Sequence, residues 1–150
     1  MAEMPANIQE FNIISGLIFV QLYTDFPVRL DIDRAVIAAA MDIPGVNWST
    51  HKLPSGRIFS AVLNNTIDWL SAEGFVKSSG THPAEGVTLS AKGLAALNAV
   101  PEGLNETIGA TLTEVAERGW RRGLNPIGDL IGGIIGGANN GVAPELIAAK

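Results

Sequence analysis

The stretch SGRIFSAVLNNTIDWLSAEG, residues 55–74, followed by FVKSSGTHPAEGVTLSAKGLAALNAV, residues 75–100, decides the fold. Apolar residues recur at steps of three and four between Phe59 and Leu70, which is the spacing of one helical face. A serine before this run and a glycine after it suit the two ends of a helix. We therefore predict a helix that begins near Ser55 and ends at Gly74.

Two short β-prone runs after this helix predict a hairpin. They are Phe75-Val76-Lys77 and Val87-Thr88-Leu89, separated by a polar turn that contains Gly80, Pro83 and Gly86. Alternation along the runs places Phe75 and Val87 or Leu89 inward, and Lys77 and Thr88 outward. Helix, hairpin and a closing helix capped by Ser90, with Leu94, Leu97 and Val100 facing the core, are typical of a winged-helix domain. The expected fold is mainly α with a small β-hairpin wing.

Two further helices are expected upstream. Ile8–Asp25 carries two apolar stripes, so it is either the central helix of the fold or a helix whose outer stripe meets a partner. Pro27–Leu30 then predicts a short strand that pairs with the wing, and Asp31 a cap for a helix over Ile32–Met41. Asp42–Pro54 is loop by composition, and it is longer than the roughly 3–4-residue turn of a compact helix-turn-helix.

Composition limits the classes of function. With 47% hydrophobic and 17% charged residues, the chain can build a core and is not a disordered protein. A net charge of −5 is the opposite of what a free-standing nucleic-acid binder usually carries. There is no cysteine, so disulfides and thiolate metal sites are excluded. The segment Met1–Pro5 has no basic residue, which argues against a secretory signal, and we expect a soluble, cytoplasmic protein.

The polar stripe of the predicted helix over residues 55–74 is the first candidate site. Arg57 and Asn64 have the side chains that read guanine and adenine in the major groove. Asp68 lies on the same stripe and would repel phosphate, so a solvated polar face remains the alternative.

The residues 70–76 (LSAEGFV) and 87–94 (VTLSAKGL) are similar to the wing region of MarR- and PadR-like bacterial regulators. The similarity covers about residues 27–100. It implies a DNA-facing set of Arg57, Asn64, Lys77 and His82, with terminal helices that form a dimer. The acidic balance, the long loop before Ser55 and the glycine-rich C-terminal segment depart from that pattern.

No motif indicates catalysis or a bound cofactor. His51 and His82 are isolated in the sequence, whereas zinc sites place their ligands at tight spacing. The run Gly132–Gly137 is not followed by the lysine that a phosphate-binding loop needs. We expect a non-enzymatic protein with no cofactor and no metal.

The C-terminal region is the second candidate site. Asn105 could cap a helix with Ile108, Leu112, Val115 and Gly119 on one face, and Arg118 lies at its end. The following segment, residues 124–138, interleaves glycines with isoleucines. Since each glycine costs a helix about 1 kcal/mol relative to alanine, this segment needs support from the domain, a second copy, a partner or a bilayer. The expected contact residues are Trp120, Arg121, Arg122, Ile127, Ile131, Gly132, Ile134, Ile135 and Gly136.

These patterns predict a winged-helix domain over residues 1–103 and a C-terminal interaction segment over residues 104–150. We expect a protein-interaction adaptor or regulatory subunit that self-associates through this segment. Two alternatives stay open: a dimeric DNA-binding transcriptional regulator, and a membrane-associated effector that uses residues 120–138.

Overall fold

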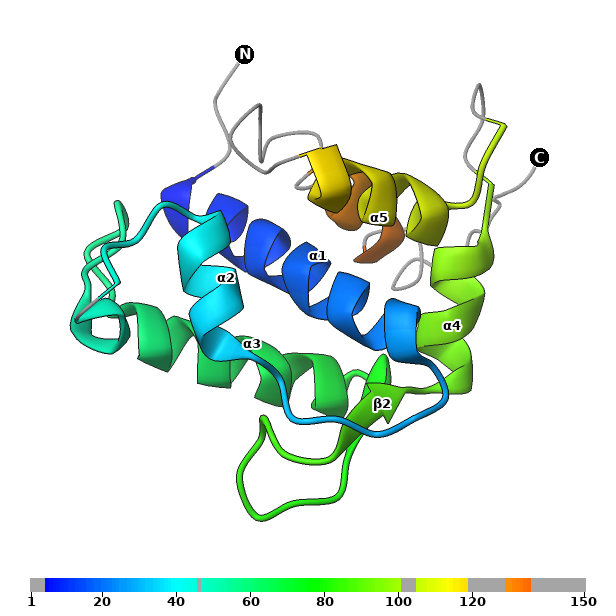
Figure 1. The fold of residues 1–150 in the computed structure, drawn as a ribbon, viewed down its shortest axis with the longest axis horizontal. Coiled ribbons are helices and arrows are strands. Elements are labelled where there is room, and N and C mark those ends of the chain that lie inside the picture. The colour runs from blue at the N-terminus through cyan, green and yellow to red at the C-terminus, as the bar shows by residue number, and fades with distance from the viewer. Residues whose placement is uncertain (1–4, 46, 101–104, 119–128, 136–150) are drawn as a thin grey trace.

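The chain is mainly helical, with one small β-hairpin, as the computed structural model in Figure 1 shows. The structure describes residues 5–45, 47–100, 105–118 and 129–135. The elements are α1 (Ala6–Asp25), α2 (Arg34–Ala40), the 3-10 helix η1 (Trp48–Thr50), α3 (Phe59–Ala72), β1 (Val76–Ser78), β2 (Val87–Leu89), α4 (Ala91–Asn98) and α5 (Ile108–Arg118). The predicted fold class, mainly α with a small hairpin, is confirmed at this level.

Helix α1 is the central element of the fold. It runs between α3 and α5 and also contacts α2 and β2 (Figure 1). Ile14 and Ile18 on this helix are completely buried, as is the small residue Ser15. The two apolar stripes therefore face two different partners within the chain, and the prediction of a central helix is confirmed.

The described residues after position 104 pack back onto the same core. Ile108 and Leu112 of α5 are buried there, together with Ile131 from the helical turn at residues 129–135. Helices α1 and α5 approach closely at Gly109. A Cβ atom at this position would lie 2.5 Å from the ring of Tyr23 on α1. The predicted division at residue 103 stays a prediction, but the segments on either side of it share one hydrophobic core.

Helix α3 ends as the sequence predicts. Gly74 has a φ of +85°, which glycine adopts without steric cost. The Gly74 N–H donates to the Ser71 carbonyl at 3.1 Å, and the Phe75 N–H donates to the Leu70 carbonyl at 2.8 Å. This pair of bonds is a Schellman motif, and it turns the chain directly into β1.

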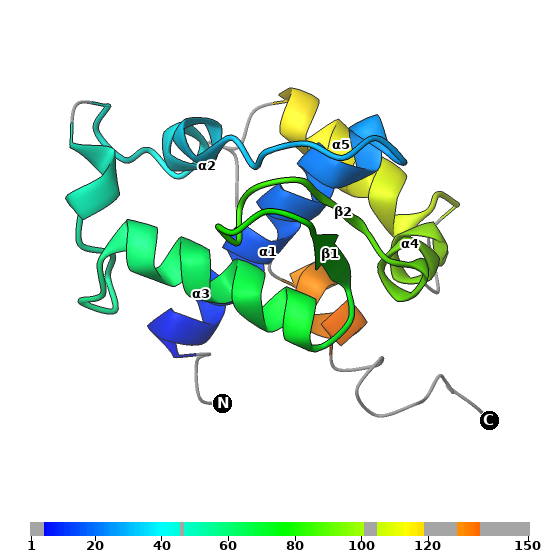
Figure 2. The ribbon, with the colours of Figure 1, turned by 90° about the horizontal axis from the view of Figure 1, so that it is seen from below.

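An isolated bridge adds one residue to the free edge of the hairpin. Strands β1 and β2 are antiparallel, with Val76 opposite Leu89, and Leu30 bridges to Val87 on the other edge of β2. The predicted pairing of the segment before α2 with the wing is thereby confirmed. Figure 2 shows the hairpin lying beside α3, with the chain between α1 and α2 passing over it.

Ser90 joins the end of α3, the hairpin and α4. Its hydroxyl accepts from the Gly93 N–H at 3.0 Å, as predicted for an N-cap, and donates to the Gly74 carbonyl. Leu97 is buried, but Val100 is 55% exposed, because α4 ends at Asn98. The prediction that Val100 faces the core was wrong.

The start of α2 differs from the prediction. Asp33, rather than Asp31, caps this helix by accepting from the Val36 N–H at 3.2 Å. Asp31 instead accepts from the Gly86 N–H at 3.0 Å. The pairing of residues 30–32 with the hairpin keeps this stretch extended, which delays the helix until Arg34.

The start of α3 also lies later than predicted. Ser55 falls in a turn, and the helix begins at Phe59. Gly56 has a φ of +89°, which a helix does not allow, and Lys52 bridges to Ile58 across the turn. The buried Glu10 carboxylate accepts from the Ser55 N–H at 2.9 Å and fixes this turn against α1.

Three smaller expectations need correction. Thr107, rather than Asn105, caps α5 by accepting from the Ala110 N–H at 3.1 Å. Thr88 is buried rather than outward, because both edges of β2 are paired and the hairpin packs on α1. The predicted loop over Asp42–Pro54 contains η1, whose Trp48 ring meets Phe59 edge to face.

Among the described helices, none is both long and apolar enough to cross a membrane.

Candidate functional site

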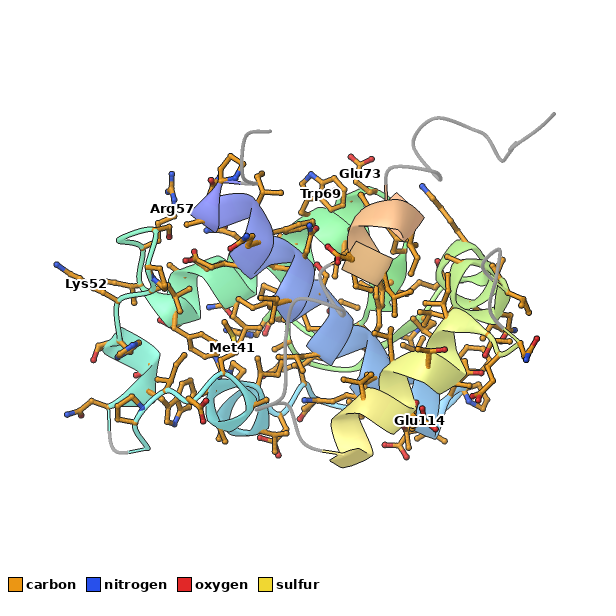
Figure 3. The ribbon with its side chains drawn as sticks, turned by 90° about the horizontal axis from the view of Figure 1, so that it is seen from above. Met41, Lys52, Arg57, Trp69, Glu73 and Glu114 are labelled. Atoms are coloured by element: carbon orange, nitrogen blue, oxygen red, sulfur yellow. The ribbon has the colours of Figure 1, made fainter. Side chains whose placement is uncertain are left out.

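An open apolar groove lies between the first half of α1 and the outer face of α3. Its volume is about 400 Å³. Ile8 and Phe11 form the α1 wall, and Val62 and Trp69 form the α3 wall. Figure 3 shows Arg57 beside the start of α1 and Trp69 farther along the molecule.

The groove follows from helical spacing on both walls. Its α1 residues, Asn7, Ile8 and Phe11, lie within one turn of each other, and its α3 residues run from Val62 to Trp69. At 1.5 Å per residue, the α3 wall spans about 10 Å, or two helical turns. Thr66 on this wall has its hydroxyl satisfied by the Val62 carbonyl at 2.7 Å. The remaining polar groups lie at Asn7, Asn65 and Arg57.

Aromatic rings join the two walls of the groove to each other and to the core. Phe11 and Trp69 meet edge to face with ring centroids 5.0 Å apart, and Trp69 stacks on Phe75 with centroids 6.4 Å apart. Phe75 is completely buried, and the Lys92 ammonium lies 4.4 Å from its ring centroid. Trp69 is therefore fixed by partners on two sides, although it remains part of an open surface.

Arg57 supplies the charge of the groove. It is exposed, and its guanidinium has no hydrogen-bond or ion-pair partner among the described residues. The nearest acid along α1, Glu10, is 5% exposed, binds the Ser55 N–H and does not line the groove. Within the part of the chain that the structure describes, the groove thus combines apolar walls with an unpaired cation at one end.

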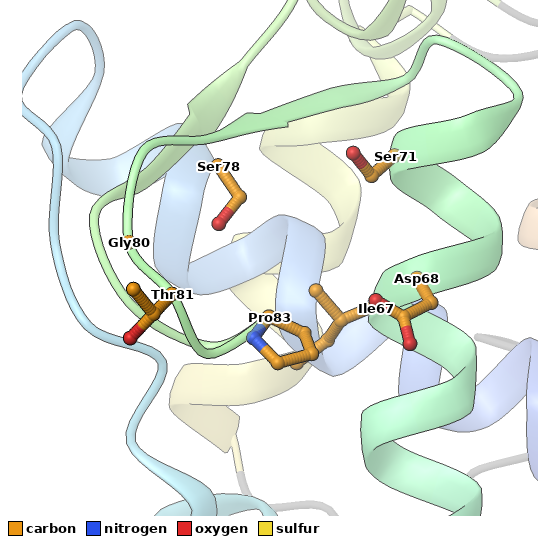
Figure 4. Close-up of a pocket in the computed structure, with 7 residues that line it drawn as sticks. All are labelled: Ile67, Asp68, Ser71, Ser78, Gly80, Thr81 and Pro83. Atoms are coloured by element: carbon orange, nitrogen blue, oxygen red, sulfur yellow. The ribbon is translucent and has the colours of Figure 1, made fainter.

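A second, smaller pocket separates α3 from the hairpin. Its volume is about 210 Å³, and Figure 4 shows α3 as one wall and the hairpin as the other. Asp68 and Ser71 line it from α3, and Ser78 and Thr81 line it from the hairpin. Asp68 is the charged residue among its described lining residues, and its carboxylate would repel a phosphate group at this position.

The four residues predicted to face DNA do not line one common pocket among the two described above. Arg57 lines the α1–α3 groove, and neither pocket includes Asn64, Lys77 or His82. His82 uses Nδ1 to accept from the Ala84 N–H at 3.2 Å, so one ring nitrogen holds the hairpin turn. Whether these residues contact DNA stays a prediction.

The C-terminal contact residues divide into two groups. Ile131, Ile134 and Ile135 are buried in the core of this chain, and Gly132 faces Asn12 of α1. The support that this segment needs therefore comes, over residues 129–135, from the chain's own α1 and the core around it. Outside the described residues lie Trp120, Arg121, Arg122, Ile127 and Gly136.

No metal centre forms in the described part of the chain, where no three His, Asp or Glu side chains gather. Apart from Arg57, the groove residues were not predicted as a site from the sequence, because Val62 belongs to the apolar face between Phe59 and Leu70 that was expected to be covered. The available signal was the apolar pair Ile8 and Phe11 near the start of α1, where an outer stripe had been considered for a partner.

The groove is thus the place where open apolar surface and a free cation meet within the described residues. Comparison with protein-family models, curated proteins and solved structures gives no match.

Proposed function

We propose that the chain is a non-enzymatic protein-binding module, an adaptor or regulatory subunit with a winged-helix arrangement. Its α1–α3 groove binds an amphipathic segment of a partner protein. The observation that carries this proposal is the open apolar groove with the fixed aromatic pair Phe11 and Trp69. Aromatic anchors of this kind contribute most of the binding energy in protein interfaces.

The shape of the groove favours a helix over a small molecule. Pockets for small ligands bury about 70–90% of the ligand surface, which requires enclosing walls. Here Ile8 is 42% exposed, and the groove is a furrow between two helices. An amphipathic helix fills such a furrow by inserting residues at i, i+3, i+4 and i+7.

A dimeric DNA-binding regulator is the second candidate, and the order of α3, hairpin and α4 favours it. The charges favour a protein partner instead. Phosphate contacts need lysines and arginines, whereas the chain carries a net charge of −5 and the α3–hairpin pocket contains Asp68. Arg57 lies at the α1–α3 groove, separate from that pocket.

A display selection tests the proposed function. Helical peptides from a random amphipathic library are selected on the full chain and counter-selected on the Val62→Asp variant. This change places a charge in the apolar wall. The matched control is Ala61→Asp, which adds the same charge one residue away at an exposed position outside the groove.

The proposal expects enriched peptides that bind wild type and Ala61→Asp alike and bind Val62→Asp at least about tenfold more weakly. Peptides that ignore both substitutions, or no enrichment, would count against the groove. In parallel, fluorescence anisotropy with mixed-sequence duplex DNA measures the rival function. Tight, salt-dependent binding that is lost in Lys77→Glu and kept in Val62→Asp would favour the DNA regulator.

A further inference from the structure

The charge at one end of the groove points to the chemistry of the partner. We infer that the segment bound by the α1–α3 groove is an amphipathic helix with a carboxylate side chain at the end that lies over Arg57. This inference rests on the proposed function and names the class of partner for the same groove.

The first argument is the state of Arg57. The guanidinium is a permanent cation with five donors in a planar fork, and it prefers a carboxylate. No acceptor for it is found among the described residues, and the residue is exposed at the edge of the groove. A carboxylate of the partner would form an ion pair with this guanidinium at little desolvation cost, because the site stays open to water.

The second argument is the direction of the two helices. Asn7 of α1 lines the groove together with Arg57, which precedes α3, so both helices begin at the same end. The first turns of α1 and α3 contain no acidic residue, and neither Pro5 nor Ile58 supplies a capping side chain. The Phe59 N–H donates to the His51 carbonyl at 2.8 Å, but the dipoles of both helices still add partial positive charge to that of Arg57.

The third argument is the balance of charge beyond the other end. Glu73 follows Trp69 by four residues, is exposed and lies near it in Figure 3. Residues four apart on a helix are neighbours on one face. The Lys92 ammonium donates to the Glu73 carbonyl at 2.8 Å, so a positive charge offsets that of Glu73 at this end. The groove is therefore positive at Arg57, apolar over its middle and balanced in charge beyond Trp69. A bound helix with its acid at the Arg57 end matches this order.

A charge-swap cycle tests the inference. Two synthetic helices share one Leu/Phe stripe at i, i+3, i+4 and i+7 spacing, and one ends in Glu-Glu whereas the other ends in Lys-Lys. Their Kd values are measured at low and high salt on wild type, Arg57→Glu and Lys52→Glu. Lys52 is an exposed cation that does not line the groove, so its variant carries the same charge change.

We expect wild type and Lys52→Glu to bind the Glu-Glu helix about three- to tenfold more tightly than the Lys-Lys helix at low salt. Arg57→Glu should reverse this preference, and added salt should reduce it. Equal affinities for both helices, or a preference that Arg57→Glu leaves unchanged, would overturn the inference. The proposed function would survive such a result if binding remained sensitive to Val62→Asp.

Two other outcomes overturn more than the charge assignment. If no helix binds in a manner that depends on Val62, the proposed function fails together with the inference. If the chain self-associates and Val62→Asp abolishes this, the groove belongs to a second copy of the chain. Light scattering of wild type and Val62→Asp across a concentration series distinguishes these cases.

Discussion

Phe11 of α1 meets Trp69 of α3 edge to face, with ring centroids 5.0 Å apart and ring planes at 84°. The same indole stacks on Phe75, which follows α3 and is completely buried. One aromatic cluster therefore joins both walls of the groove to the core, so the binding surface and the fold depend on the same residue.

Replacing Trp69 should lower the free energy of unfolding. Trp69→Ala removes both ring contacts, and we expect a loss of about 2–3 kcal/mol in the free energy of unfolding, because the side chain is only half-buried. Trp69→Phe keeps a ring against Phe11 and should lose less than half as much. Urea denaturation measures both values. Full stability in Trp69→Ala would show that the indole does not join the walls.

The C-terminal segment should stabilise the fold through Ile131. This side chain is completely buried, so Ile131→Ala should lower the free energy of unfolding by about 2–4 kcal/mol. Gly133→Ala is the matched control, since a Cβ there would meet nothing within 4 Å. It should be neutral or stabilise by up to about 1 kcal/mol, because alanine is the better helix former. Equal stabilities of the two variants would contradict the packing of residues 129–135 on α1.

Gly93 shows the opposite case, in which added helix propensity loses to a steric clash. Gly93→Ala would gain up to about 1 kcal/mol from propensity. However, its Cβ would lie 2.1 Å from the Phe75 carbonyl oxygen, which is backbone and cannot move without shifting the hairpin. We expect a net loss of about 1–3 kcal/mol, measured by thermal unfolding. An increase in Tm would refute this close contact.

Ser90 should contribute more than an ordinary cap. Its hydroxyl accepts from Gly93 and donates to the Gly74 carbonyl, and the residue is buried. Ser90→Ala leaves both groups without this partner and should cost about 1–3 kcal/mol. Ser71→Ala, at an exposed position of α3, should change stability by less than about 0.5 kcal/mol. Denaturant midpoints of the two variants provide the comparison.

Local patterns in the sequence predicted most of the elements. The glycine stop at Gly74 and the cap at Ser90 depend on nearby residues, and both are confirmed. The pairing of Leu30 with Val87 joins distant parts of the chain, and it was expected from the winged-helix pattern and is also confirmed. Two of the helix starts that failed, those of α2 and α3, depend on long-range contacts. Asp31 is held by Gly86 of the hairpin, and Ser55 is held by Glu10 of α1.

The groove could not be predicted in the same way. Val62 and Trp69 have the spacing of a core-facing stripe, and only the packing of α1 on α3 leaves both of them at an open groove. The reverse holds for Ile131, whose glycine-rich surroundings suggested an outward contact, although α1 offers it a complementary face. Periodicity identifies an apolar face, but tertiary packing decides what covers it.

The most direct test uses the indole N–H signals of the isotope-labelled full chain in a two-dimensional NMR spectrum, recorded during titration with the Glu-Glu helix. Trp69 lines the groove, whereas Trp48 packs on Phe59 away from it and serves as an internal control. The account predicts that the Trp69 signal shifts in a saturable manner and the Trp48 signal stays in place, and that Val62→Asp abolishes the shift. An unchanged Trp69 signal at peptide concentrations that saturate binding would contradict it.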